Sequence, residues 1–422
     1  MDIYLTIILG LYLVTILFDY TMKFINLRYL NKHGAKIPPE FEGYIVGDLL
    51  KKTRDYTLEN SQFEYFSSIF DNIILIVFLF GGLLNIYNSW VASIYSSFIL
   101  TGLIFFFLLS MASSILDIPF DLYGTFKIEN KYGFNTKTIK LWIIDFIKSL
   151  LISTIIFAII GGIAFWIIKS NPDYWWLWLW GFFLIFSLFM IYISPYVIEP
   201  LFNKFTPIEE EEGLEDKIKE MMSTAGIKVS RVFKMDASKR SKHTNAYFTG
   251  IGKVKRIILY DTLLEKMTHN EILAILAHEV GHWKKKHLFK RIVVSEIVGF
   301  ISIYISFKII QSNILTDLFH IEIPTFFVKL VLLGFLGSII SFPFTPISAY
   351  FSRRHERQAD RFACELTGET ESLASSLIKL SKDNLSNLHP HPLFAKLYYS
   401  HPPVVNRVRE IRGMKIVHPL GE

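Results

Sequence analysis

Seven long apolar stretches constrain the fold of this chain more than any other feature of its sequence. A helix needs about 20 apolar residues to cross the hydrocarbon core of a bilayer. Hydrophobic residues make up 51% of the chain and charged residues only 19%, whereas soluble domains carry about a quarter charged residues. The sequence therefore predicts a mainly α, multi-pass membrane protein with seven transmembrane helices. The expected spans lie near residues 3–20, 69–88, 92–116, 141–168, 175–197, 289–311 and 325–350.

The loops between these spans differ in their content of lysine and arginine. The first loop, the loop before residue 141, the long loop 198–288 and the tail after residue 350 are basic, whereas the loops near 89–91 and 312–324 carry no lysine or arginine. The positive-inside rule predicts that the basic loops face the cytoplasm and that the N-terminus lies outside. The net charge of +6 belongs to these loops, so we expect no nucleic-acid partner. The compact loops favour a prokaryotic cell membrane. If the host is eukaryotic, we expect the endoplasmic reticulum membrane instead.

The stretch AILAHEVGHWKKKH, residues 274–287, contains the pattern His-Glu-x-x-His. His278 and His282 are four residues apart, so one face of a helix can present both to a single metal ion. In zinc peptidases the glutamate of this pattern, here Glu279, takes a proton from a water molecule that the zinc activates. The single cysteine, Cys364, excludes a multi-cysteine zinc site. We expect one Zn²⁺ per chain; the alternative is a helix whose two histidines have other partners.

A catalytic zinc site of this kind needs a third protein ligand. In the metzincins that ligand is a histidine six residues after the second one, and His287 comes only five residues after it. The segment SRRHERQADRFACELTG, residues 352–368, offers a second helix with carboxylates. We predict Glu356 as the third ligand, with His355 as its rival. Asp360 is then the acceptor that holds a ligand histidine by its other ring nitrogen.

The only long soluble segment between expected spans covers residues 198–288. Two stretches in it, KVSRVFKMD and KRIILYDTLL, are rich in β-branched and aromatic residues and predict short strands. Thr268 and Glu271 have the spacing of a capping box, which predicts the start of the helix with the two histidines. We divide the chain into a five-span membrane region (1–198), a cytoplasmic protease domain (199–288), two further spans (289–350) and a C-terminal segment that completes the zinc site (351–422).

Asp145, Lys148 and Glu296 are ionisable residues within expected spans. Asp145 and Lys148 are three residues apart near the cytoplasmic end of the fourth span, a spacing that allows an ion pair and leaves open the same two alternatives as for Glu296. Glu296 lies in the sixth span. A charged group at such a position is costly, so it either lines an internal space or reaches the membrane interface.

Six segments of the chain resemble the type I CaaX prenyl endopeptidases, a family of integral-membrane zinc metalloproteases. PFDLYGTFKIENKYGFN (119–135) resembles the family's loop after the third span, and EPLFNKFTPIEEEE (199–212) its entry to the protease domain. Four active-site motifs follow in the family's order: NAYFTG (245–250), AHEVGHW (277–283), RRHERQAD (353–360) and YSHPP (399–403). The order of these motifs over most of the chain is far more specific than any one of them.

The resemblance implies a gluzincin-like zinc protease domain with a small β element, beside seven helices that surround a water-filled intramembrane chamber. It implies His278, His282 and Glu356 as the zinc ligands and Glu279 as the general base.

The resemblance also implies residues that bind the substrate. Asn245 would bind the peptide backbone, because an edge strand in such proteases pairs with an extended peptide. His401 would donate a hydrogen bond to the oxyanion of the tetrahedral intermediate. Arg407 would brace the site or meet a substrate carboxylate. The alternatives are a simple turn into a strand for the segment with Asn245 and a plain loop histidine for His401.

The activity that the resemblance implies is removal of the last three residues of a C-terminal CaaX sequence whose cysteine is isoprenylated. The expected partners are the lipid bilayer and a peptide or protein C-terminus, with or without an isoprenyl group. One alternative is a membrane quality-control protease like HtpX, but that family is shorter and has fewer spans. Another is a non-catalytic, zinc-stabilised membrane scaffold. Structural zinc sites are usually closed by four protein ligands, so Glu279 and a three-ligand site argue for catalysis.

Overall fold

Seven helices or helix pairs in the described part of the chain are long and apolar enough to cross a membrane, which confirms the predicted mainly α, seven-span architecture. The computed structural model describes residues 3–208, 213–249 and 254–415. The long helices are α1 (Ile3–His33), α2 (Gly47–Phe80), α4 (Phe98–Tyr123), α6 (Ile139–Ser170), α7 (Trp175–Val197), α12 (His287–Ile310), α14 (Phe326–Ser341) and α15 (Thr345–Thr367).

Shorter helices connect and flank the long ones. The α-helices among them are α3 (Leu83–Ile94), α5 (Asn130–Tyr132), α8 (Glu199–Phe202), α9 (Leu214–Thr224), α10 (Asp261–Leu264), α11 (His269–Lys284), α13 (Ile314–Leu318), α16 (Glu371–Asp383), α17 (Pro392–Tyr398) and α18 (Val404–Arg412). Single turns of tighter or wider helix are η1 (Pro39–Phe41), η2 (Gly124–Glu129), η3 (Ala237–Lys239) and η4 (Phe342–Phe344).

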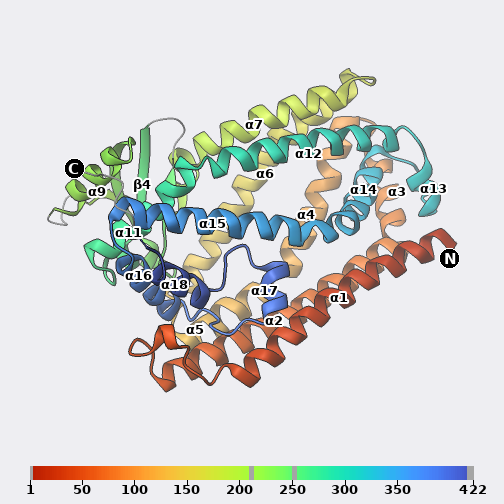
Figure 1. The fold of residues 1–422 in the computed structure, drawn as a ribbon. Coiled ribbons are helices and arrows are strands. Elements are labelled where there is room, and N and C mark those ends of the chain that lie inside the picture. Colours follow the sequence, from red (N-terminus) through yellow and green to blue (C-terminus); the bar gives the residue numbers. More distant parts are fainter. Residues whose placement is uncertain (1–2, 209–212, 250–253, 416–422) are drawn as a thin grey trace.

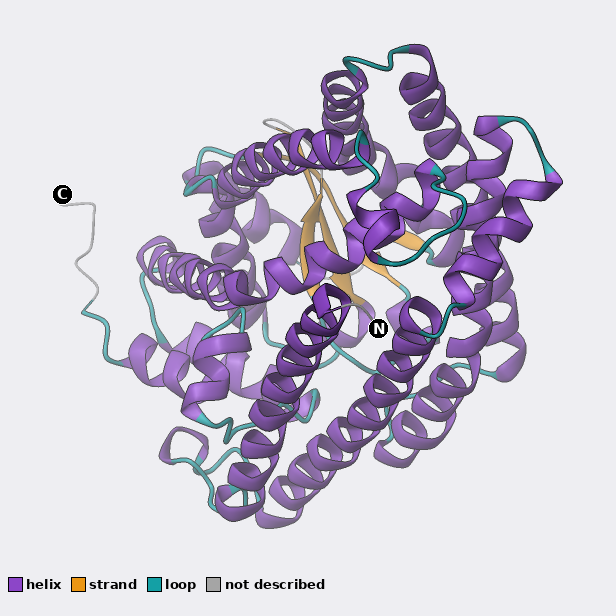
Figure 2. Cartoon of the chain, turned by 90° about the vertical axis from the view of Figure 1, so that its right-hand side faces the viewer, coloured by secondary structure: helices purple, strands orange, loops and turns teal. Residues whose placement is uncertain are grey.

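The sheet and most of the short helices lie at one end of the molecule (Figure 1). Figure 1 shows β4, α9, α11, α16 and α18 gathered at one end, with the N-terminus and α13 at the other and the long helices running between them. From the N-terminal side, the strands are seen behind the long helices (Figure 2). Large apolar side chains such as Leu17, Ile155 and Ile185 stay exposed along these helices, as expected of surfaces that face lipid.

The chain breaks within the predicted second span, 69–88. Helix α2 ends at Phe80, Gly81 follows as its C-cap, and Gly82 has a φ of +81°. Only glycine adopts that conformation without strain. Residues 83–94 then form the separate helix α3, and the third span begins at Phe98 rather than near 92. Helix α2 also begins at Gly47, so much of the expected first loop is helical.

The seventh span does not end where the apolar pattern ends. Proline residues at 343 and 346 accompany the short turn η4 between α14 and α15. Helix α15 then continues past residue 350 to Thr367, where Gly368 caps it at a φ of +72°. One helix therefore leads from the membrane region directly to the predicted third ligand, and residue 350 marks no break in the structure.

Four short strands form one small sheet in the order β1-β2-β4-β3. The two predicted strands are present as β2 (Lys228–Met235) and β4 (Val254–Tyr260), which run parallel. The sequence did not predict β1 (Phe205–Pro207) or β3 (Ala246–Thr249), which pair antiparallel with β2 and β4. Strand β3 is thus an edge strand. A buried apolar cluster fixes α9 and α11 against the sheet, with Ile218, Met222, Val232, Ile257, Leu259 and Leu276 among its members.

An ion pair connects the membrane helix α6 to the segment between β2 and β3 of the sheet. Both carboxylate oxygens of Asp145 on α6 lie 2.9 Å from the Arg240 guanidinium, which follows η3. Lys148 instead donates to the backbone oxygen of Leu201 at 2.9 Å. The pair of Asp145 with Lys148 that the spacing allows is therefore not formed, because a bidentate arginine from a distant loop satisfies the carboxylate.

Candidate metal centre

Helix α11 carries His278 and His282, and its start is fixed by the predicted capping box. Thr268 accepts from the backbone nitrogen of Glu271, whose side chain bonds back to the backbone nitrogen of Thr268. Burial raises the pKa of Glu271, but the ammonium of Lys379 on α16 and the capping hydrogen bonds outweigh it and hold that pKa below its usual range. The cap therefore also joins α11 to α16.

Helix α15 lies against α11 at a point where both helices carry small residues. A Cβ atom on Gly281 would lie 2.9 Å from Ala359 Cα and 3.1 Å from its carbonyl oxygen. Ala277, Ala359 and Ala363 are fully buried beside it. The backbones can approach this closely only because Gly281 has no side chain. This contact brings the carboxylate of Glu356 to the two imidazoles.

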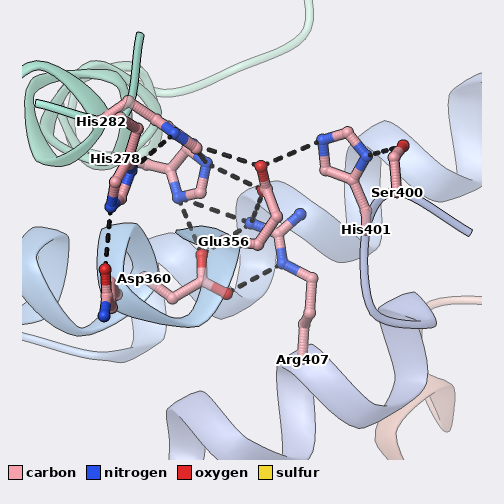
Figure 3. Close-up of polar contacts among 9 residues, drawn as sticks. His278, His282, Glu356, Asp360, Ser400, His401 and Arg407 are labelled. Carbon is pink, nitrogen blue, oxygen red and sulfur yellow. Dashed lines mark hydrogen bonds and ion pairs between the residues drawn. The ribbon is translucent and has the colours of Figure 1, made fainter. Parts of the chain in front are cut away.

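Three potential ligand atoms converge between the two helices (Figure 3). Each of His278 Nε2 and His282 Nε2 lies 3.3 Å from an oxygen of Glu356. The two nitrogens are 3.2 Å apart, and the donor atoms of all three residues lie within 4.8 Å of one another. No other group of this kind is found among the residues that the structure describes. His355, the rival ligand, is not in the group.

The donor set fits a divalent metal ion. Glu356 Oε2 is buried, and although His278 Nε2 lies 3.3 Å away, it accepts no hydrogen bond of good geometry from the described residues. Burial lowers the pKa of His278, but Asp360 and Glu356 outweigh it and raise that pKa to about 9. The surroundings of His278 therefore favour a positive charge. Two histidines and one carboxylate, with a further position open, form a donor set that suits a catalytic zinc ion.

Asp360 and Arg407 brace His278 from behind. Asp360 Oδ1 lies 2.8 Å from His278 Nδ1. The Arg407 guanidinium, buried on α18, donates to both oxygens of Asp360 at 2.6 and 2.9 Å. Burial alone would lower the pKa of Arg407. The Asp360 carboxylate has the larger effect, so the pKa of Arg407 lies above its usual value. Because this carboxylate engages the guanidinium at two nitrogens, the geometry favours bracing over contact with a substrate carboxylate.

His287 orients His282, a contact that the sequence did not predict. His287 is buried at the start of α12, with its Nδ1 3.1 Å from His282 Nδ1 and its Nε2 2.9 Å from Gln358 Oε1. An amide oxygen only accepts, so His287 donates through Nε2 and accepts from His282 through Nδ1. This leaves the lone pair of His282 Nε2 free on the side of Glu356. His355 stacks on the His287 ring at 4.0 Å.

His401 approaches the site from the loop between α17 and α18. Its Nε2 lies 3.3 Å from Glu356 Oε1, its Nδ1 3.0 Å from Ser400 Oγ, and its side chain is 59% exposed. Burial lowers the pKa of His401. The positive charge of Arg407 and the two histidines of α11 lower this pKa further, and together these effects exceed the opposite effect of the Glu356 carboxylate. A neutral ring can still donate through Nε2.

The segment before His401 is held by Arg353 of α15. The Arg353 guanidinium donates to the backbone oxygens of Ala395, Lys396 and Tyr399 at the end of α17.

Two further predicted residues lie on α11 itself and at the start of the strand that contacts it. Glu279 follows His278 and is half-buried. Asn245 directly precedes β3: its backbone oxygen accepts from Tyr260, and its side-chain oxygen accepts from the backbone nitrogen of Ala246 at 2.8 Å. Strand β3 contacts α11. The edge of the sheet therefore lies next to the helix with the two histidines.

A helix with two imidazoles, a second helix with a carboxylate, a small sheet and a bundle of membrane helices together define a membrane metalloendopeptidase. Family models match almost the whole chain: "CAAX prenyl protease N-terminal, five membrane helices" over residues 26–204 and "Peptidase family M48" over residues 209–415. The chain belongs to peptidase family M48, within the group of the type I CaaX prenyl proteases.

Named relatives are similar over most of their length. The chain is 34% identical to CAAX prenyl protease 1 homolog of Arabidopsis thaliana, with 96% of this chain and 97% of the relative covered. It is 34% identical to CAAX prenyl protease 1 of Saccharomyces cerevisiae (90% and 89%) and 33% identical to an uncharacterized metalloprotease of Bacillus subtilis (80% and 80%). The crystal structure of S. mikatae Ste24p is similar with a TM-score of 0.90 and 30% identity, over 97% of this chain and 99% of that chain.

Proposed function

We propose that this chain is a membrane zinc endopeptidase that removes the C-terminal tripeptide of CaaX-type substrates, including isoprenylated ones. The observation that carries the proposal is the convergence of His278, His282 and Glu356 next to Glu279. The names of the relatives from Arabidopsis and yeast supply the substrate class. The match to five N-terminal membrane helices argues against the shorter quality-control proteases.

Each residue of the site has its own role in the proposed reaction. A zinc ion bound by the two histidines and Glu356 would polarise the scissile carbonyl and lower the pKa of a water molecule. Glu279 takes the proton from that water and passes it to the leaving amine. Asp360, held by Arg407, keeps the His278 ring in the tautomer that leaves Nε2 free. His287 does the same for His282.

The substrate peptide binds in an extended conformation along β3. This strand has a neighbour on one side only within the described sheet, so its other edge offers backbone hydrogen bonds. Asn245 fixes the start of this edge through its bond to the backbone nitrogen of Ala246. His401, beside Glu356, donates to the oxygen on which negative charge develops during attack.

The active site faces the cytoplasm in this proposal. The elements of the site lie at the end of the molecule opposite to the N-terminus (Figure 1), and the loops at their end are the basic ones. A prokaryotic cell membrane is the expected location, or the endoplasmic reticulum membrane in a eukaryotic host.

The substrate class is tested with matched CaaX peptides that differ only in a farnesyl group on the cysteine. We expect the purified protein to cleave the farnesylated peptide with a kcat/KM at least about tenfold higher, because the buried isoprenyl chain adds apolar contact area. Cleavage is followed by mass spectrometry of the released tripeptide. Equal rates on both peptides would exclude the requirement for the isoprenyl group and leave a broader peptidase.

Replacement of His287 tests its role in orienting His282. We expect His287→Phe to weaken zinc binding by about 10- to 100-fold, the usual cost of losing a partner that orients a metal-bound histidine. Zinc affinity is measured by competition with a chelator, in the absence of substrate. Gln358→Leu should weaken binding in the same direction but less. Unchanged affinity in both variants would show that the backbone alone places His282.

A further inference from the structure

A second cluster of ionisable groups lies outside the metal centre, at the base of β3. His243 stands two residues before Asn245 in the chain. Its Nε2 lies 3.2 Å from Glu129 Oε2 of η2, and its Nδ1 lies 3.0 Å from Asn384 Oδ1, just beyond α16. The imidazole stacks on Phe134 with the ring centroids 4.1 Å apart. One side chain thus joins the segment after the third span, the end of α16 and the strand β3.

The backbone around His243 is held by the same elements. The backbone nitrogen of Thr244 donates to Asn384 Oδ1 at 3.2 Å, and Thr262 Oγ1 donates to the backbone oxygen of His243 at 2.8 Å. Just upstream, the backbone nitrogen of Lys242 donates to the oxygen of Phe134. In the described sheet β3 has a strand neighbour on one side only, so these bonds to Phe134, Asn384 and Thr262 anchor its start.

Both ring nitrogens of His243 face atoms that only accept hydrogen bonds. Glu129 Oε2 belongs to a carboxylate, and Asn384 Oδ1 is fixed as the amide oxygen because it also accepts from Thr244. A neutral imidazole has one N–H and satisfies only one of them, whereas the imidazolium satisfies both. Burial lowers the pKa of His243, but the hydrogen bonds to Glu129 and Asn384 outweigh it and hold the pKa above its usual range.

Tyr56, Lys266 and Asp383 are the further polar and charged groups in the surroundings of His243. Glu129 Oε1 accepts from the phenol of Tyr56 on α2 at 2.6 Å. Lys266, after α10, opposes protonation of His243, but it lies 3.5 Å from Asp383 on α16. Because the pKa of His243 is raised in the folded state, its protonation stabilises the fold at pH values below the unfolded-state pKa. This stabilisation is lost as the pH rises through the folded-state pKa.

We propose that His243 is a positioning residue whose protonated ring fixes the start of β3 for substrate binding. The inference rests on the proposed function of β3 as the strand that pairs with the peptide. Loss of the proton, or of the ring, frees the strand and weakens substrate binding. The metal ligands and Glu279 lie on other elements, so the chemical step is unchanged once the peptide is bound.

His243→Phe is the first test, because phenylalanine keeps the stack on Phe134 and removes both donors. We expect KM for a CaaX peptide to rise about tenfold with kcat within about twofold, the scale expected for losing hydrogen bonds to a charged group. His33→Phe is the matched control, because the His33 ring also packs on an aromatic ring, that of Tyr29, at 4.3 Å. Its KM should not change.

Two conservative variants test the charge itself. Because loss of the proton weakens substrate binding, we expect KM to rise as the pH increases through the pKa of His243. Asn384→Asp keeps the acceptor for Thr244 and adds a negative charge beside His243, so this rise of KM should move about one pH unit higher or more. Glu129→Gln removes the opposite charge and should move the rise lower. A purely structural role predicts no such opposite shifts, so shifts that are absent or in one direction overturn the proposal.

Hydrogen exchange separates this inference from the proposed function, because it needs no substrate. We expect the amides of residues 243–249 to exchange faster in His243→Phe than in the unaltered protein at the same pH. Unchanged exchange overturns the role of His243. Faster exchange without any change in KM retains the anchor but overturns the pairing of the substrate with β3.

Discussion

Glu279→Gln is expected to abolish peptidase activity while the protein keeps its zinc. Glutamine has almost the same shape as glutamate but cannot take a proton from water at neutral pH. General acid–base catalysis contributes about 10²- to 10⁴-fold to such reactions, so we expect kcat to fall on the order of 10³-fold. Glu279 is not among the three converging donors, so the zinc content should stay near one ion per chain.

The measurement is tripeptide release together with metal analysis of the same purified sample. Glu365→Gln is the matched control, since this glutamate lies exposed on α15, away from the site, and its loss should leave kcat unchanged. Full activity in Glu279→Gln would refute the mechanism. A loss of zinc together with activity would instead show that Glu279 holds the metal.

Local patterns in the sequence were enough to predict the membrane helices and the residues of the converging cluster. Apolar stretches near 20 residues identify spans without knowledge of their neighbours, and a spacing of four places His278 and His282 on one helix face. Glu356 was identifiable because a zinc site of this kind needs a third ligand and residues 352–368 offer a second helix with carboxylates. Gly281 and Ala359 form the close contact between the two helices in the structure.

Features that depend on distant parts of the chain were not predictable. Strand β3 has only four residues, and its pairing with β4 defines it. The partner of Asp145 is 95 residues away. His287 reaches His282 because Lys286 adopts a left-handed conformation, with a φ of +56°, between α11 and α12. Lysine rarely adopts this conformation, so nothing in the sequence signals the turn.

Removal of the Glu356 carboxylate is expected to have the largest effect on the metal itself. The two helices meet so that this one carboxylate faces both imidazoles at 3.3 Å. In Glu356→Ala the two histidines would remain as the only protein ligands, without the negative charge that offsets the cation. Loss of an outer partner alone costs about 10- to 100-fold in metal affinity, so we expect loss of a ligand to cost more than about 100-fold.

Chelator competition and metal analysis of purified Glu356→Ala and Glu356→Gln measure this effect independently of activity. His355→Phe is the matched control, because His355 is adjacent in the chain and stacks on His287 at 4.0 Å, a contact that phenylalanine preserves. We expect this control to keep near one zinc ion per chain. An unchanged zinc content in Glu356→Ala, with loss of zinc in His355→Phe, would transfer the role of third ligand to His355. That outcome would require α15 to rotate, because the two side chains point about 100° apart around the helix.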